Sequence, residues 1–307
     1  QMCIRDRYYT DCQKKNPSSI TSYRISNCYS EIGDYASALQ HIDNAIALDS
    51  TDYDNVMAKA DILYESGDAK AAILELDKYV AHYPEYYGGY YRRGWYKDNS
   101  SDVDGAIEDY TMAIVLQPDY AYAYLGRGDM YALKGDNKSA EADYKKVIEL
   151  DTIPSNSSCA QYAYLELGQK EKAVEFMNNV IEKEPNDAGN YYDAACLHSR
   201  MGELDKSVEF LQTALKKGFR RFSHLEMDDD LDAIRELPKY EELIRQYKSI
   251  FETEIEDEMQ ATSVYEEQTV EIPFSKEDGV CKVKCAINNL PLYFVFDTGA
   301  SDVSVSY

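Results

Sequence analysis

Gly67-Asp68-Ala69-Lys70-Ala71-Ala72 is the stretch that decides the fold, because its pattern returns along the chain at a fixed period. Gly67 stands at a predicted turn between two helices, and a small residue follows it five positions later. The turn position recurs with spacings of 34, 34, 34, 33 and 34 residues, at Gly33, Gly67, Ser101, Gly135, Gly168 and Gly202. The small residue recurs with it, at Ala38, Ala72, Ala106, Ala140, Ala173 and Ser207. Such a period indicates stacked repeats that share one continuous core.

Each position in the repeat has a physical reason. Glycine accepts the left-handed conformation that ends one helix, and the small residue lets the paired helix approach closely. An aspartate that suits the first turn of the next helix follows the glycine in Gly33-Asp34, Gly67-Asp68 and Gly135-Asp136. Twelve positions after the small residue, a third set of residues, often proline, stops the second helix: Ser50, Pro84, Pro118, Thr152, Pro185 and Phe219. Each unit is therefore predicted to be two antiparallel helices.

Residues 19–221 hold six such units, which predicts a mainly α fold, a right-handed α-solenoid of helix pairs. The period and the turn signature resemble the tetratricopeptide repeat. The resemblance implies a scaffold for protein or peptide binding and leaves the ligand open. The third unit departs from the pattern, because Lys97 replaces the tyrosine of other units and the segment from Asp98 to Asp104 is polar. A looser third unit is expected.

The resemblance also implies that the first helices of successive units line a concave groove. The groove residues expected on this basis are mainly aromatic and acidic: Tyr23, Asn27, Asp61, Tyr91, Trp95, Asp129, Tyr162 and Tyr192. Lysines that would clamp a peptide carboxylate are missing from these positions. The hypothesis is a groove for extended segments that carry lysine, arginine or aromatic residues. The alternative is that many of the 29 tyrosines only fill the space between helices.

The segments around the repeats have different expected roles. Residues 1–7 are expected to be a non-native start, and residues 8–18 the remnant of a preceding repeat, so that the chain is a fragment. Residues 222–247 are predicted to cap the array, with the acidic cluster Asp228-Asp229-Asp230 at the start of a closing helix. This cluster lacks the glycine and the glutamate of a calcium-binding loop. Residues 248–268 are predicted to be an acidic linker.

Composition limits the function. The net charge of −24 argues against a nucleic-acid partner and favours a basic peptide or protein. The seven cysteines show no paired or metal-ligand spacing, so we expect buried thiols in a reducing compartment and no metal or other cofactor. No run of 18 apolar residues predicts a membrane span, and no signal peptide is visible. A cytoplasmic location is therefore the expectation.

From residue 269 the pattern changes from helices to strands. The stretch Val280 to Ile287 alternates between apolar and polar residues, and Asn288-Asn289 suits a tight hairpin turn. The returning stretch, Leu290 to Phe296, is apolar and ends at Asp297-Thr298-Gly299-Ala300-Ser301. A strand followed by this tight turn presents one carboxylate at the end of the strand.

This hairpin and turn resemble the N-terminal part of the retroviral-type (retropepsin-like) aspartic peptidases and their bacterial relatives. The resemblance implies an endopeptidase in which two carboxylates share a proton and activate a water molecule. It assigns one carboxylate to Asp297, close backbone approach to Gly299, and hydrogen bonds to Thr298 and Ser301. No second Asp-Thr-Gly occurs in the chain, so the pair of carboxylates is expected to form across a homodimer.

Residues 269–307 match only the start of such a domain, a short incomplete all-β segment. About 40 residues rarely fold alone, so this chain by itself is expected to be inactive and poorly ordered there. The competing hypothesis is a non-enzymatic tetratricopeptide interaction scaffold in which the strands form an ancillary β module.

Overall fold

A computed structural model of the chain describes residues 18–31, 33–155, 157–263, 274–277, 280–287 and 290–296. The chain divides into two compact units, Gln1–Met259 and Gln260–Tyr307. The expected non-native start, residues 1–7, and all but the last residue of the expected remnant repeat, residues 8–18, lie outside the described residues.

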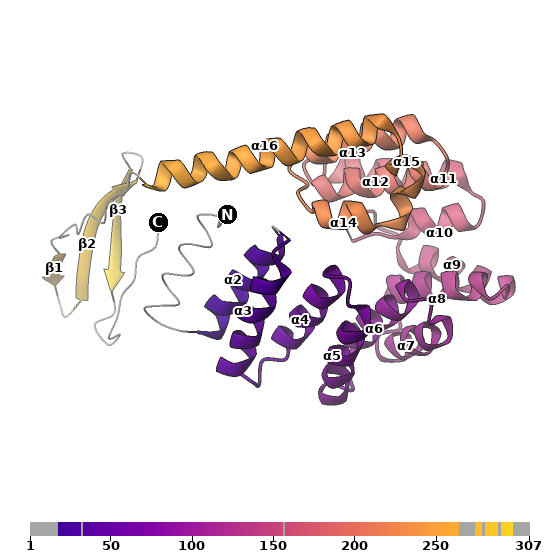
Figure 1. Ribbon diagram of the computed structural model, residues 1–307, viewed down its shortest axis with the longest axis horizontal. Coiled ribbons are helices and arrows are strands. Elements are labelled where there is room, and N and C mark those ends of the chain that lie inside the picture. The colour runs from indigo at the N-terminus through magenta and orange to yellow at the C-terminus, as the bar shows by residue number, and fades with distance from the viewer. Residues whose placement is uncertain are drawn as a thin grey trace. The chain divides into compact units, whose positions relative to one another are not determined.

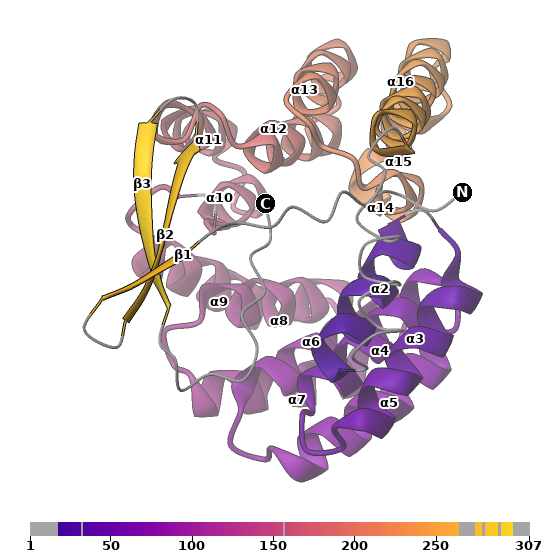
Figure 2. The same cartoon turned by 90° about the vertical axis from the view of Figure 1, so that its left-hand side faces the viewer.

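Helix pairs build the first unit (Figure 1). In Figure 2 the first helix of each pair lies on the inside of an arc and the second helix on the outside. We call the inner side, formed by the first helices, the concave face. The pairs are α2 (Ser19–Glu31) with α3 (Tyr35–Leu48), α4 (Asp54–Glu65) with α5 (Ala69–His82), α6 (Tyr87–Asn99) with α7 (Val103–Leu116), α8 (Ala121–Leu133) with α9 (Asn137–Leu150), α10 (Ala160–Glu166) with α11 (Lys170–Lys183), and α12 (Ala188–Arg200) with α13 (Leu204–Lys216). The predicted mainly α fold of repeated helix pairs is confirmed.

The turns between paired helices follow the predicted chemistry. The five turn glycines have φ angles between 72° and 92°, and nothing lies within 4 Å of where a Cβ would stand. Glycine is therefore needed for its backbone conformation alone. Ser101 holds the same turn position in the third unit with a φ of 63°. The next residue caps the following helix by accepting a hydrogen bond from a backbone N–H three positions on, at Asp34, Asp68, Asp102 and Asp136.

Small and large residues alternate in the core. The predicted small residues are at most 2% exposed. Large side chains of the second helices fill the space beside them and are also buried: Ile42, Leu76, Tyr110, Tyr144, Met177 and Leu211. The third unit is not held loosely, because Lys97 replaces the missing tyrosine with an ion pair, its Nζ 2.8 Å from buried Asp109. Arg93 binds the same carboxylate at 2.6 Å.

A cap of short helices follows the repeats: α14 (Phe222–Met227), the 3₁₀ helix η1 (Asp229–Leu231), α15 (Asp232–Arg235) and the long α16 (Pro238–Ser263). The single closing helix predicted from the sequence is thus interrupted, and α16 begins at Pro238, where proline suits the first turn. Leu231, Ile234 and Leu243 are buried against the last repeat, as their spacing predicts. Asp228 caps η1 by accepting a hydrogen bond from the N–H of Asp230.

In its described residues, the second unit has three antiparallel strands in the order β1-β2-β3, with β1 at Phe274–Glu277, β2 at Val280–Ile287 and β3 at Leu290–Phe296. The pairing of β2 with β3 runs from Cys281 opposite Phe296 to Ile287 opposite Leu290. Asp297, Thr298, Gly299 and Ser301, the residues assigned to peptidase chemistry, lie outside the described residues.

Candidate functional site

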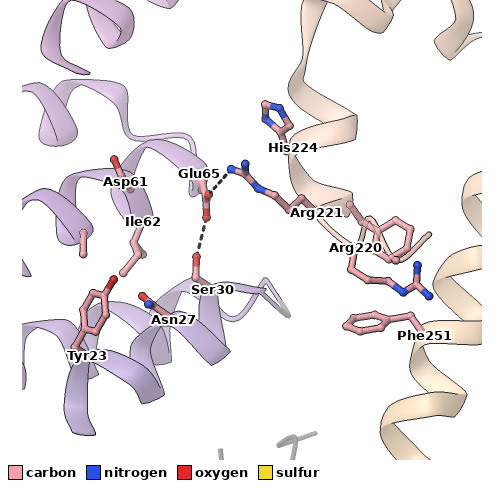
Figure 3. Close-up of a pocket in the computed structure, with 13 residues that line it drawn as sticks. Tyr23, Asn27, Ser30, Asp61, Ile62, Glu65, Arg220, Arg221, His224 and Phe251 are labelled. Carbon is pink, nitrogen blue, oxygen red and sulfur yellow. Dashed lines mark hydrogen bonds and ion pairs between the residues drawn. The ribbon is translucent and has the colours of Figure 1, made fainter. Parts of the chain in front are cut away.

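Three of the expected groove residues, Tyr23, Asn27 and Asp61, line a cavity of about 600 Å³ (Figure 3). The wall that faces them comes from the segment after α13 and from the cap, and it includes Arg220, Arg221, Phe222, His224 and Phe251. The Arg221 guanidinium lies 4.0 Å from Glu65, which also accepts a 2.7 Å hydrogen bond from Ser30. This cavity therefore has an acidic side formed by the first two repeats and a basic side formed by the C-terminal segment.

A group of tyrosines, which we call the tyrosine belt, crosses α6 and α8: Tyr87, Tyr91, Tyr120 and Tyr122. Tyr91 meets Tyr120 edge-on with ring centroids 5.0 Å apart, and Tyr87 lies 4.9 Å from Tyr120. Burial raises the pKa of Tyr120 to about 12, so its hydroxyl stays protonated at neutral pH. Tyr91 and the expected groove residue Trp95 also pack against the core around Tyr110. The alternative that some aromatic residues only fill the space between helices therefore holds for part of this surface.

The concave face also contains cations that the sequence reasoning missed. Arg92 of α6 has its Nη1 3.7 Å from the carboxylate of Asp61, which accepts a hydrogen bond from the hydroxyl of Tyr96. Arg200, at the end of α12, binds Glu166 at 2.5 Å. Neither arginine is among the residues that the sequence predicted to line the groove. The concave face therefore holds arginine side chains as well as carboxylates.

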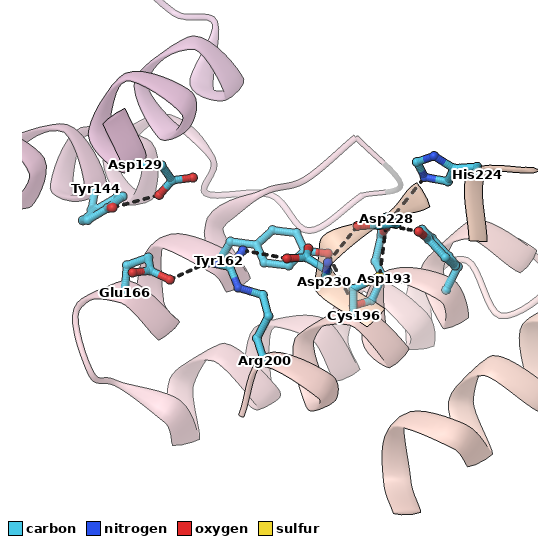
Figure 4. Close-up of polar contacts among 11 residues, drawn as sticks. Asp129, Tyr144, Tyr162, Glu166, Asp193, Cys196, Arg200, His224, Asp228 and Asp230 are labelled. Carbon is cyan, nitrogen blue, oxygen red and sulfur yellow. Dashed lines mark hydrogen bonds and ion pairs between the residues drawn. The ribbon is translucent and has the colours of Figure 1, made fainter. Parts of the chain in front are cut away.

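Four carboxylates of the first helices and the cap have raised pKa values, and we call them the carboxylate cluster: Asp98, Asp129, Asp193 and Asp230. Asp129, an expected groove residue, accepts a 2.8 Å hydrogen bond from Tyr144 (Figure 4). Burial, reinforced by neighbouring carboxylates, raises the pKa to about 7 for Asp129 and Asp193. The same causes raise the pKa of Asp230 to about 6. At neutral pH the cluster thus holds negative charge that the protein stabilises poorly.

The last two expected groove residues lie in different environments. Tyr162 of α10 is half-buried, with the guanidinium of Arg200 5.3 Å from its ring centroid. Tyr192 is only 6% exposed, stacks on Phe219 at 4.5 Å and donates a hydrogen bond to Asp228. The expectation that Tyr192 lines an open groove is therefore corrected, because the segment after α13 covers the last repeat.

The described residues also test the predictions about metal sites, membrane spans and buried cysteines. Among them, no group of three or more histidine, cysteine or acidic side chains has an arrangement that holds a metal ion. No helix in the described part of the chain is long and apolar enough to cross a membrane. Cys28, Cys159 and Cys196 are buried. The cytoplasmic location remains a prediction.

Stacked helix pairs with a turn every 33 or 34 residues, an inner face that carries tyrosines and carboxylates, and a C-terminal cap define a helical-repeat scaffold. Family profiles described as tetratricopeptide repeat match residues 31–89, 91–155, 162–187 and 188–216. The chain belongs to the tetratricopeptide repeat family.

Individual relatives are distant. A chloroplastic protein of Arabidopsis thaliana is 27% identical over 87 residues, a match that spans 27% of this chain and 26% of that protein. A tetratricopeptide repeat protein of Parabacteroides merdae has a structure similar to 75% of this chain and 90% of its own, with 14% identity and a TM-score of 0.51. The repeat protein TTC0263 of Thermus thermophilus matches 65% of this chain and 100% of its own, with 23% identity and a TM-score of 0.46. At these identities the structural likeness concerns the fold alone.

Proposed function

We propose that this repeat scaffold binds, on its concave face, an extended segment of a partner protein that carries lysine or arginine. The observation that supports the proposal best is the carboxylate cluster. Its aspartates are held where burial and the repulsion of neighbouring carboxylates raise their pKa values to about 6 or 7. A cation from a partner relieves this repulsion, so the surface is electrostatically complementary to a basic segment.

The tyrosine belt supports the same ligand. Tyrosine offers a large apolar ring and a polar tip, and its face attracts ammonium and guanidinium groups. The net charge of −24 adds long-range attraction for a basic partner, and salt screens this attraction. Binding is therefore expected to weaken as the salt concentration rises.

Fluorescence anisotropy with matched peptides tests this proposal. Three labelled 15-residue peptides share their aromatic residues and carry lysine and arginine, glutamine, or glutamate at the same positions. We expect only the basic peptide to bind at pH 7.5, and its affinity to fall between 50 and 300 mM salt. Asp129→Asn is expected to weaken binding, whereas Glu108→Gln, which removes the same charge from an exposed residue of α7, is expected to leave it unchanged. Equal binding of the three peptides, or binding of none, would contradict the proposal.

We also propose a role for residues 269–307 as the start of a retropepsin-like aspartic endopeptidase. In this arrangement the repeats, residues 19–221, recruit the partner. The cap is residues 222–247, and the acidic linker between the repeats and the peptidase segment is residues 248–268. The support is the β2–β3 hairpin, in which β3 ends at Phe296, directly before Asp297. Asp297 supplies one carboxylate, Thr298, Gly299 and Ser301 support it, and a second copy supplies the other carboxylate in a homodimer.

A hydrolysis assay separates this role from that of a non-enzymatic β module. The protein that carries the whole domain is expected to cleave peptides, with an acid-shifted pH profile because the two carboxylates share a proton. Asp297→Asn is expected to abolish cleavage, whereas Asp302→Asn leaves the Asp-Thr-Gly sequence intact and serves as the control. Cleavage that survives Asp297→Asn, or no cleavage by the whole protein, would favour the β module.

A further inference from the structure

We propose that the cavity between the first two repeats and the C-terminal segment binds a stretch of the partner in which a basic and an acidic residue are adjacent in sequence. The acidic wall, on α2 and α4, receives the lysine or arginine. The basic wall, formed after α13, receives the aspartate or glutamate. The inference rests on the proposed binding of a basic segment and adds a sequence requirement at one place along it.

The cavity has the size of a ligand site and walls of opposite charge (Figure 3). Its volume of about 600 Å³ lies within the usual range for ligand pockets. Asp61 and Glu65 of α4 supply the carboxylates of one wall, and Arg220 and Arg221 supply the guanidinium groups of the other. A ligand that matches both walls therefore carries opposite charges on its two sides.

Two of these four charged groups are engaged within their own wall. Asp61 has the Nη1 of Arg92 at 3.7 Å from its carboxylate. The Nη1 of Arg220 donates hydrogen bonds to two backbone carbonyl oxygens close to it in sequence, at 2.6 and 3.2 Å. Figure 3 shows Arg221 reaching across the cavity towards Glu65. Glu65 and Arg221 are therefore the charges that meet a ligand first.

Glu65 and Arg221 form a weak contact that a ligand can replace. Their charged atoms lie 4.0 Å apart, and the side chains are 31% and 66% exposed. An ion pair this long and this exposed contributes little to stability. A ligand that places a cation beside Glu65 and a carboxylate beside Arg221 replaces one weak pair with two.

An extended peptide presents its side chains in the arrangement that these walls require. In an extended chain, neighbouring side chains point to opposite sides. A lysine or arginine directed at Glu65 therefore directs the next residue towards Arg221. A second cation at that next position is repelled by Arg221, whereas a carboxylate is attracted. Adjacent residues of opposite charge are thus favoured at this place.

Aromatic rings supply contact area between the charged groups. Tyr23, Phe222 and Phe251 line the cavity, and the ring centroids of the two phenylalanines lie 5.9 Å apart. The aliphatic stems of long charged side chains pack on such rings while their charged ends reach further. His224 also lines this cavity, but burial lowers its pKa, so the positive charge of its wall at neutral pH comes from the arginines.

Fluorescence anisotropy with the full chain tests the requirement for adjacent charges. Two labelled peptides of the same composition and net charge carry Lys-Glu-Ser or Lys-Ser-Glu between identical uncharged residues, with further lysines near their ends. The first peptide directs its central charges to opposite sides, and the second directs them to the same side. Arg221→Glu reverses the charge of the basic wall. Arg245→Glu makes the same change at an exposed residue of α16 outside the cavity, and circular dichroism checks that both variants fold.

We expect the unchanged protein and Arg245→Glu to bind the Lys-Glu-Ser peptide about fivefold more tightly than the Lys-Ser-Glu peptide, the size of one exposed ion pair. Arg221→Glu is expected to lose this preference. Equal binding of both peptides by the unchanged protein, or a preference that survives Arg221→Glu, would overturn the inference and leave the proposed function standing. Binding of the purely basic peptide alone would have the same meaning. Failure of every peptide to bind, the purely basic one included, would overturn both.

Discussion

Replacing Asp193 by asparagine is predicted to stabilise the fold at neutral pH. The folded protein holds the Asp193 carboxylate beside Asp228 and Asp230, and burial raises its pKa from 3.8 to about 7. Because the folded-state pKa is raised, the group's contribution to stability is full at low pH and is lost as the pH rises through about 7. Asparagine keeps the shape of the side chain and removes the charge, so this loss disappears.

The magnitude follows from the size of the shift. A change of about three pKa units corresponds to about 4 kcal/mol, which is the upper limit at pH 8. The side chain is partly exposed and shares its repulsion with neighbouring carboxylates, so water and coupled protonation reduce the effect. We expect Asp193→Asn to raise the free energy of unfolding by about 1–2 kcal/mol at pH 8, which is a few degrees in Tm for a unit of this size.

Thermal unfolding followed by circular dichroism at pH 6, 7 and 8 measures this effect. The Tm difference between Asp193→Asn and the unchanged protein is expected to grow from pH 6 to pH 8. His41, His198 and His224 have lowered pKa values and act in the opposite direction below about pH 6.5, but they are present in both proteins and cancel in the difference. Asp205→Asn removes the same charge from an exposed residue of α13 and serves as the control.

Two results would refute this reasoning. One is a Tm difference that does not change with pH, which would mean that the Asp193 carboxylate titrates as it does in water. The other is a lower Tm for Asp193→Asn at pH 8, which would mean that the ionised carboxylate has a stabilising partner. A variant that is more stable yet binds basic peptides less tightly would indicate that Asp193 serves binding at the expense of stability.

Three further predictions concern the scaffold. Ser101→Gly removes the strain of a serine at a φ of 63° and is expected to stabilise the chain by about 1 kcal/mol, measured as a higher urea midpoint. Asp143→Ala leaves Arg127 without the carboxylate that it contacts through two 2.8 Å hydrogen bonds, and is expected to cost about 3 kcal/mol, whereas Glu141→Ala on the exposed side of the same helix changes stability little. Leu211→Ala opens a cavity at a fully buried position and is expected to cost about 3 kcal/mol in the same assay.

The repeat array was predictable because its signals are local. Gly67, Asp68 and Ala72 act within a few residues of one another, and a turn glycine or a buried alanine is needed wherever a unit repeats. The ion pair of Lys97 with Asp109 was not predicted. The sequence shows that a lysine replaces an aromatic residue there, but it does not show which carboxylate neutralises the lysine's charge.

The carboxylate cluster was predictable only in part. Asp129 stands at an expected groove position, but Asp98 and Asp193 stand beside such positions and Asp230 belongs to the cap. The positions of these side chains depend on the curvature of the repeat array and on the way the cap packs against the last repeat. The spacing of the repeats predicts neither feature. The same packing buries Tyr192, which the repeat pattern alone places in the open groove.

The central claim is that the concave face binds a basic segment, and photo-crosslinking tests it most directly. A lysine- and arginine-bearing peptide with a photoreactive group is mixed with the full chain at pH 7.5, and the linked residues are identified by mass spectrometry. Cross-links are expected on the first helices and the cap loop, at or beside Tyr122, Tyr162 and Asp230. Cross-links confined to the second helices α5, α7, α9 and α11 would contradict it.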